Sequence, residues 1–179
     1  PSSPRDARDL LIASVLSNDP VIYIDDRWLY DESETLEPIK EFTLDNFKPT
    51  VEVKGNDITI VASGYSTLIS KKALKKLSER NISPEIIDLK VLSDMNIDSI
   101  ITSVTKTKRL LCVDGGWSEC GISSEVIAKV CENIDVKLLE NSPKRITLPR
   151  APAPSSKALE SIYYPNEIDV INKCIDMIK

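Results

Sequence analysis

The sequence contains no histidine. This absence removes the commonest general base and the usual partner of a serine or cysteine nucleophile, and it leaves only Asp, Glu, Lys or Tyr for such a role. Aromatic residues make up 5% of the chain and glycine occurs five times, so Ile, Leu and Val must supply the core. The four cysteines, Cys112, Cys120, Cys131 and Cys174, form no Cys-x-x-Cys pair. We interpret them as reduced structural thiols in preference to a disulfide or a zinc site.

The sequence also lacks a basic tract and a long apolar run. The formal net charge is −5, which argues against nucleic acid as a partner because phosphate neutralisation needs clustered Lys and Arg. Lys71, Lys72, Lys75 and Lys76 follow helical spacing and are typical of a solvated helix face. No run approaches the roughly 20 apolar residues that cross a bilayer, and no signal peptide opens the chain. We therefore expect no membrane partner and a cytoplasmic location, or a mitochondrial or plastid matrix in a eukaryote.

The first 48 residues resemble the end of a domain rather than a whole one. Ser3 and Pro4 are typical of a helix start, apolar residues then recur at helical intervals, and Pro20 stops the pattern. Residues 21–24 predict a short strand. Residues 25–48 are acidic and without period, and we interpret them as an irregular linker whose larger side chains, Trp28, Leu29, Tyr30 and Phe42, pack against a surface.

From residue 49 onward, predicted strands alternate with predicted helices. The strands are expected at residues 50–53, 58–62, 84–89, 110–113 and 136–139. The helices are expected at residues 66–80, after Asp94, after Gly121 and after Asn166, and the Pro-rich residues 143–154 are expected to be irregular. This alternation predicts a three-layer α/β/α fold with a largely parallel sheet. Residues 50–53 stand too close to residue 58 for a crossover, so this strand is expected to enter antiparallel at or near an edge.

One loop at the carboxyl end of a predicted strand could contact a ligand. Gly64, Tyr65 and Ser66 join a strand to a helix, and the free N–H groups of a helix start can hold an anion. The glycine spacing fits neither a phosphate-binding P-loop nor a dinucleotide fingerprint. A tight turn that caps the helix is the simpler interpretation, and an anion contact is the alternative.

A second loop, residues 114–121, contains Trp117 and Gly121. A tryptophan in a glycine-rich loop after a buried strand favours a protein interface, with packing inside the domain and a small-molecule site as the alternatives. We expect Trp28 to share such a surface. The paired acids Asp25 and Asp26 are interpreted as solvated. We assign no catalytic, cofactor-binding or metal-binding residue from these patterns.

Five motifs are more informative together than each is alone. They are Asp-Pro-Val-Ile-Tyr-Ile at 19–24, Gly-Asn-Asp-Ile-Thr-Ile-Val-Ala-Ser-Gly at 55–64, Ile-Ile-Asp-Leu-Lys-Val-Leu at 86–92, Asp-Gly-Gly-Trp at 114–117 and the Pro-rich run at 143–154. In this order they resemble motifs of the β subunits of thiamine-diphosphate-dependent 2-oxoacid dehydrogenases. That family has Gly-x-Asp-Val-Thr-Ile-Val-x-x-Gly, Val-Ile-Asp-Leu-Arg-Thr-Leu, Glu-Glu-Gly-Trp and Arg-Val-Thr-x-Pro-x-x-Pro-x-Pro. The resemblance spans nearly the whole chain.

The resemblance implies a fold and a domain organisation. The fold would be that of the transketolase C-terminal domain, a five-stranded, mostly parallel sheet with one antiparallel strand. Residues 1–30 would be the end of the pyrimidine-binding domain, residues 31–48 a linker and residues 49–179 the transketolase C-terminal-like domain. Asp25-Asp26 replaces the Glu-His that the family usually has after the strand at 19–24. The chain could therefore belong to a divergent paralogue with another acceptor or substrate.

The resemblance also implies a division of labour. In the family, thiamine diphosphate and magnesium in the full assembly decarboxylate a 2-oxoacid such as pyruvate, and the activating Glu and the catalytic His stand before the segment matched by this chain. The C-terminal domain builds the contact with a second β subunit, works beside an α-type subunit and, in some members, docks the lipoyl acyltransferase core. We therefore expect an assembly and docking domain that is inactive on its own, with an exposed apolar patch that includes Trp117.

Two alternatives belong to other classes. One is a free-standing ligand-binding or anion-binding α/β module that uses the loop at Gly64. The other is the C-terminal domain of a transferase similar to transketolase or deoxyxylulose-phosphate synthase. The sequence does not specify the 2-oxoacid, the acyl or electron acceptor, or the oligomer.

Overall fold

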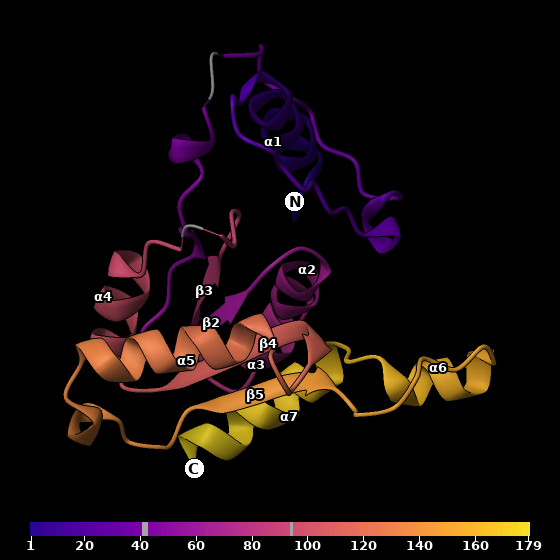
Figure 1. The fold of residues 1–179 in the computed structure, drawn as a ribbon. Coiled ribbons are helices and arrows are strands. Elements are labelled where there is room, and N and C mark those ends of the chain that lie inside the picture. Colours follow the sequence, from indigo (N-terminus) through magenta and orange to yellow (C-terminus); the bar gives the residue numbers. More distant parts are fainter. Residues whose placement is uncertain (41–42, 94) are drawn as a thin grey trace.

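The computed structural model describes residues 1–40, 43–93 and 95–179 (Figure 1). Phe42 and Asp94, for which a linker contact and a helix cap were expected, lie outside the described residues. The first helix, α1 (Pro4–Leu16), begins as predicted, because the Ser3 hydroxyl accepts the Asp6 N–H at 3.1 Å and Pro4 occupies the first helical position.

Five strands form one sheet in the order β1-β3-β2-β4-β5. They are β1 (Thr50–Val53), β2 (Ile58–Ala62), β3 (Pro84–Asp88), β4 (Leu110–Trp117) and β5 (Lys144–Leu148). β1 lies at the edge and pairs antiparallel with β3, whereas every other pair is parallel. The predicted fold class and the antiparallel edge strand are thus confirmed.

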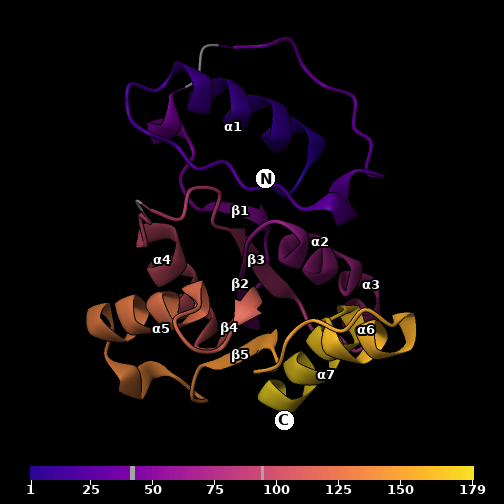
Figure 2. The same cartoon turned by 45° about the vertical axis from the view of Figure 1, so that its right-hand side comes forward.

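Helices cover both faces of the sheet, as Figure 2 shows. One face carries α2 (Tyr65–Lys72), α3 (Leu74–Ser78) and α7 (Glu167–Ile178), and the other carries α4 (Asp98–Thr107) and α5 (Ile122–Asn133). A short helix, α6 (Lys157–Tyr163), lies outside these two layers (Figure 1).

The central strand β2 shows why its residues suit this position. Ile58 and Ile60 enter the core beneath α2, α3 and α7, and Val61 enters the core beneath α4 and α5. Thr59 points to the α4 side, where its hydroxyl lies 2.7 Å from those of Ser103 and Thr107. Because successive side chains alternate between the faces, a β-branched run buries both sides of a parallel strand.

The ends of the helices follow from local chemistry. Asn166 caps α7 by accepting the Ile168 N–H at 2.8 Å, and Asp169 accepts the Asn166 N–H at 2.9 Å, which confirms the predicted capping pair. The predicted helix at residues 66–80 is divided at Ala73 into α2 and α3.

Three predicted elements were wrong. Residues 21–24 have no regular secondary structure and are largely exposed, because no strand in the described part of the chain pairs with their backbone. Residues 136–139 are not a strand but contain a one-turn helix (Val136–Leu138), which Asp135 caps through the Lys137 N–H at 3.0 Å. The fifth strand instead lies within the Pro-rich run, where the prolines at 143 and 149 flank β5 and leave its hydrogen-bond ladder intact.

Candidate functional site

The two predicted loops meet at the point where the strand order reverses. β2 and β4 are neighbours, but the helix after β2 lies on one face of the sheet and the helix after β4 lies on the other. Chain segments therefore diverge at this point and leave a crevice at the carboxyl ends of the strands, where ligands of open α/β sheets bind. β4 is longer than predicted and continues through Gly116 to Trp117, which pairs with Leu148 after an irregularity in the register.

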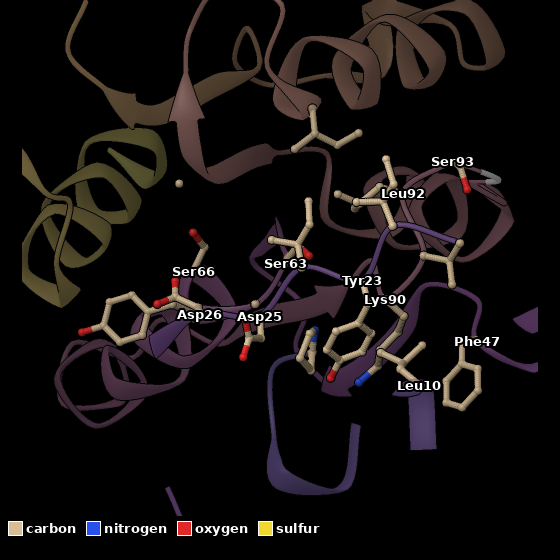
Figure 3. A pocket seen from close by; sticks show the side chains of 18 of the residues that line it. Leu10, Tyr23, Asp25, Asp26, Phe47, Ser63, Ser66, Lys90, Leu92 and Ser93 are labelled. Carbon is tan, nitrogen blue, oxygen red and sulfur yellow. The ribbon is translucent and has the colours of Figure 1, made fainter. Parts of the chain in front are cut away.

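A cavity of about 1450 Å³ occupies this crevice, between the sheet and the N-terminal segment. The walls from the sheet side include Ser63, Ser66 and the glycines of both loops. The N-terminal segment contributes Leu10, Tyr23 and the acids at 25 and 26, as seen in Figure 3.

The start of α2 closes through its own backbone. Gly64 takes a φ of +57°, a conformation that favours glycine, and no side chain caps the helix. The Ser66 N–H donates to the Ser63 carbonyl at 3.2 Å and the Thr67 N–H donates to the Gly64 carbonyl at 3.0 Å, so two of the first N–H groups are already used. The Ser66 side chain lines the crevice and is buried, and its Oγ has no hydrogen-bond partner in the described chain.

The charge of the crevice bears on which ligand it could hold. Asp25 and Asp26 line the same cavity as the start of α2. Burial raises the pKa of the Tyr65 hydroxyl, and the nearby carboxylates of Glu167, Asp26 and Glu32 raise this pKa further. A negative potential of this kind opposes an anion, so the contact at Gly64, Tyr65 and Ser66 stays a prediction without support from the charges.

The same walls do not fit a diphosphate with its magnesium ion. Acids at 25 and 26 would repel the diphosphate, and no three His, Cys, Asp or Glu side chains of the described residues gather as metal ligands. We therefore derive no chemical step through thiamine diphosphate from the residues of this chain.

The loop after β4 is held by the buried carboxylate of Asp114. This carboxylate accepts the Gly116 N–H at 2.8 Å and the Ser123 N–H at 3.0 Å, so it ties the end of β4 to the first turn of α5. Gly121 is required for this approach, because a Cβ there would lie 2.3 Å from the Trp117 carbonyl oxygen and 2.7 Å from Asp114 Oδ2. Close packing within the loop thus accounts for this glycine, while its predicted place in an interface is not tested.

Both tryptophans are half exposed and half packed. Trp117 Nε1 donates to the Tyr163 hydroxyl at 3.3 Å, and that hydroxyl donates to the Ala151 carbonyl at 2.7 Å. Trp28 contacts Tyr65 and Tyr164 edge-on, with ring centroids 4.8 and 4.7 Å away. Their role in an interface stays a prediction. The sequence analysis did not single out Tyr163, which follows the Pro-rich run.

Two regions each expose several large apolar side chains. The first region, the N-terminal surface, comprises Val15, Leu16, Ile22 and Ile24, and the second, the α6 surface, comprises Trp117, Leu159 and Ile162. Ile22 and Ile162 are the most exposed, at 88% and 82%. Surfaces of this kind mark contacts with other polypeptide. Within the described residues, no helix combines the length and the hydropathy that a membrane span requires.

The chain is similar to known proteins in sequence. The profile of the family "Transketolase, C-terminal domain" matches residues 48–170. The acetoin:2,6-dichlorophenolindophenol oxidoreductase subunit beta of Bacillus subtilis (strain 168) is 34% identical over 178 residues, which cover 99% of this chain and 52% of that protein. The pyruvate dehydrogenase E1 component subunit beta of Staphylococcus aureus (strain N315) is 34% identical over 179 residues, which cover 100% of this chain and 54% of that protein. The chain therefore spans about half the length of these relatives.

Solved structures share the fold. A split-gene transketolase, described as an inactive beta4 tetramer, aligns with a TM-score of 0.66 at 22% identity and covers 82% of this chain and 46% of its own. A 2-oxoglutarate:ferredoxin oxidoreductase from Magnetococcus marinus aligns with a TM-score of 0.54 at 14% identity. The alignment covers 76% of this chain and 21% of that chain. At these identities the likeness establishes the sheet and its helices alone.

Proposed function

Because the chain belongs to the transketolase C-terminal domain family, we propose that it is the C-terminal assembly and docking domain of the β subunit of a thiamine-diphosphate-dependent 2-oxoacid dehydrogenase. The observation that carries the proposal is the identity of 34% to a pyruvate dehydrogenase β subunit along the entire chain. This match includes residues 1–47, which precede the family domain, so the relationship extends beyond the shared fold.

The proposal assigns residues 1–30 to the end of a pyrimidine-binding domain, residues 31–48 to a linker and residues 49–179 to the C-terminal domain. Residues 21–24 support this division, because no strand of the described chain pairs with them. Unpaired backbone groups and exposed side chains such as Ile22 and Ile24 are stable when further polypeptide covers them.

The chain on its own is proposed to be inactive. In the full assembly, thiamine diphosphate with magnesium would stabilise the carbanion that forms when a 2-oxoacid loses carbon dioxide. The contribution of this chain would be to hold the subunits together, since its sequence has no histidine and its crevice does not fit the cofactor.

The proposed partners are an α-type subunit, a second β subunit and the lipoyl acyltransferase core. The α6 surface supports a contact of this kind, because Trp117 and Tyr163 hold it in place while Leu159 and Ile162 face outward. An aromatic anchor surrounded by apolar side chains is typical of the centre of a protein interface. The location that we propose is the cytoplasm, or the organelle matrix in a eukaryote.

A chimera tests the proposal. The chain replaces its aligned segment in the S. aureus pyruvate dehydrogenase β subunit, and the chimera is produced with that enzyme's α subunit. We expect a complex on gel filtration and pyruvate-dependent reduction of 2,6-dichlorophenolindophenol, with no activity from the isolated chain. A folded chimera that does not bind the α subunit would contradict the assembly role, and decarboxylation by the isolated chain at an enzymic rate would contradict its inactivity.

The transferase alternative has weaker support. Transketolases are similar in structure, but at identities near 20% they show the fold only. The two relatives reported above are an oxidoreductase subunit and a dehydrogenase subunit, which favours the dehydrogenase class.

A further inference from the structure

A buried lysine joins the N-terminal helix to the sheet. Lys90 follows β3, and its ammonium group lies 2.6 Å from Asp6 of α1, 3.0 Å from Glu52 of β1 and 2.8 Å from Asp88 at the end of β3. The Lys90 side chain is only 7% exposed. We call these four residues the Lys90 cluster.

Hydroxyl groups and a second lysine complete the cluster. The Ser2 hydroxyl lies 2.6 Å from Asp88 and 3.0 Å from Asp6, and Thr67 donates to the other oxygen of Asp88 at 2.9 Å. Lys71 of α2 lies 2.8 Å from the second oxygen of Glu52. Buried charges are tolerated when they are paired and hydrogen-bonded in this way.

Among the described residues, the two apolar cores of the domain do not extend to α1, although Leu10 and Ala13 of this helix are buried. Neither of the two core clusters on the faces of the sheet includes a residue of α1, as far as the described chain goes. The helix instead contacts its own flanking segments: Tyr23 donates to the Ala7 carbonyl at 3.0 Å, and Arg8 donates to the Glu37 carbonyl at 2.7 Å. Besides the Lys90 cluster, the half-exposed ring of Trp28 on Tyr65 and Tyr164 links this segment to the domain.

The charges make Lys90 indispensable for this contact. Asp6 is the one carboxylate of the cluster that does not come from the sheet. Without the ammonium group, Asp6 would face the carboxylates of Glu52 and Asp88 inside a poorly solvated site, and like charges at such distances repel. The lysine backbone also has a φ of +60°, a conformation that costs energy in a non-glycine residue and that the three ion pairs stabilise.

We propose that the Lys90 cluster is an ionic switch that decides whether α1 is docked on the sheet. When the cluster is fully charged, α1 is docked. When Lys90 or Asp6 loses its charge, α1 separates from the sheet while both cores of the domain stay folded. Such local opening is possible because ionic contacts join α1 to the sheet, while neither core cluster includes a residue of α1 in the described chain.

Hydrogen–deuterium exchange of the full chain tests this proposal. In Lys90→Met, which keeps most of the length of the side chain and removes its charge, we expect amides of residues 4–16 to exchange about tenfold faster or more. Peptides from β2 and β4 should keep the wild-type rate. The matched control is Lys106→Met, which removes the ion pair to Glu85 between α4 and β3 and should leave α1 unchanged.

A second variant keeps the test decisive if Lys90→Met does not fold. Asp6→Asn removes the charge that α1 contributes and leaves Lys90 paired with Glu52 and Asp88, so the ammonium group keeps two of its three carboxylate partners. We expect the same release of α1, and in the double variant the Lys90 substitution should add less than it does alone. Unchanged exchange in α1 for Asp6→Asn, or equal acceleration in α1 and β2, would overturn the proposal.

Discussion

Trp117 Nε1 donates a hydrogen bond to the Tyr163 hydroxyl at 3.3 Å, and this contact connects the end of β4 to the end of α6. The same hydroxyl donates to the Ala151 carbonyl at 2.7 Å. One buried phenol therefore fixes both the Pro-rich segment and the helix that follows it.

Replacement of Tyr163 by phenylalanine should loosen this region. Tyr163→Phe keeps the ring contact with Tyr164 but removes both hydrogen bonds of the hydroxyl, which we expect to lower the free energy of unfolding by about 1–2 kcal/mol. Urea denaturation measures this loss. Tyr164→Phe is the control, because no hydrogen bond of its hydroxyl is found in the described chain. Equal stability of Tyr163→Phe and the wild type would contradict the role assigned to the hydroxyl.

Gly121 and Gly115 should respond differently to alanine. In Gly121→Ala the new Cβ would overlap the Trp117 carbonyl at 2.3 Å, so the turn has to shift and we expect a loss of about 2 kcal/mol in the free energy of unfolding. In Gly115→Ala the nearest atom is Ser66 Oγ at 3.7 Å, an ordinary contact, and the change should stay within about 0.5 kcal/mol. Thermal or urea unfolding of both variants compares them directly, and similar losses would rule out the steric explanation.

Local patterns were sufficient to predict much of the fold. The runs at β2 and β3 contain enough β-branched residues to identify buried strands, and Asn166 with Asp169 marked the start of α7. The errors arose where a capping residue or a neighbouring strand determines the local structure. The apolar residues at 136–139 suit a strand, but they fold as a turn because Asp135 caps them, and β5 forms where β4 offers an edge. Pairing of this kind depends on contacts distant in sequence.

The candidate site was predicted in part for the same reason. The loops at Gly64 and Trp117 could be located because both follow recognisable strands. The Lys90 cluster could not be found from the sequence, since Asp6, Glu52 and Asp88 come from three separate elements and meet only after the sheet has formed. The Asp-Leu-Lys motif at residues 88–90 places two of the four residues together, and nothing in the sequence connects them to α1.

Acid should weaken the Lys90 cluster. Burial alone would raise the pKa values of Asp6 and Glu52, but the charges and hydrogen bonds of Lys90, and of Lys71 for Glu52, outweigh burial, so both pKa values are lowered. Carboxylates with lowered pKa values stabilise the folded state above their ordinary values of 3.8 and 4.5, and this stability is lost as the pH falls through the lowered folded values. The pKa of Lys90 is raised by Asp88 and Asp6 against the effect of burial, so this lysine stays charged throughout the acid range.

The measurement for this prediction is the free energy of unfolding between about pH 6 and about pH 3, the range in which carboxylates titrate. The wild type should lose more stability than Asp6→Asn, because the variant has one fewer carboxylate to protonate. Parallel pH profiles for the two proteins would contradict the assignment.

The cysteines should divide by burial. Burial raises the pKa of Cys174 to about 12, and burial together with the nearby Asp114 carboxylate raises that of Cys112 still further. Since the thiolate is the reactive form, both thiols should resist alkylation in the folded chain, whereas the exposed Cys120 should react. Iodoacetamide labelling followed by peptide mass spectrometry measures this, with labelling in urea as the control. Rapid modification of Cys112 in the folded protein would contradict the packing described.

The two apolar surfaces should make separate contributions to self-association. The N-terminal surface exposes Ile22 and the α6 surface exposes Ile162, and burying either side chain against a second molecule is favourable by about 2 kcal/mol or more. Sedimentation velocity over a range of concentrations should therefore show association of the wild type that Ile22→Lys and Ile162→Lys each reduce. Ser78→Lys, which adds the same charge at an exposed position of α3, should leave it unchanged. If all three lysine variants reduce association equally, net charge and not apolar contact is responsible, and neither surface qualifies as the predicted interface.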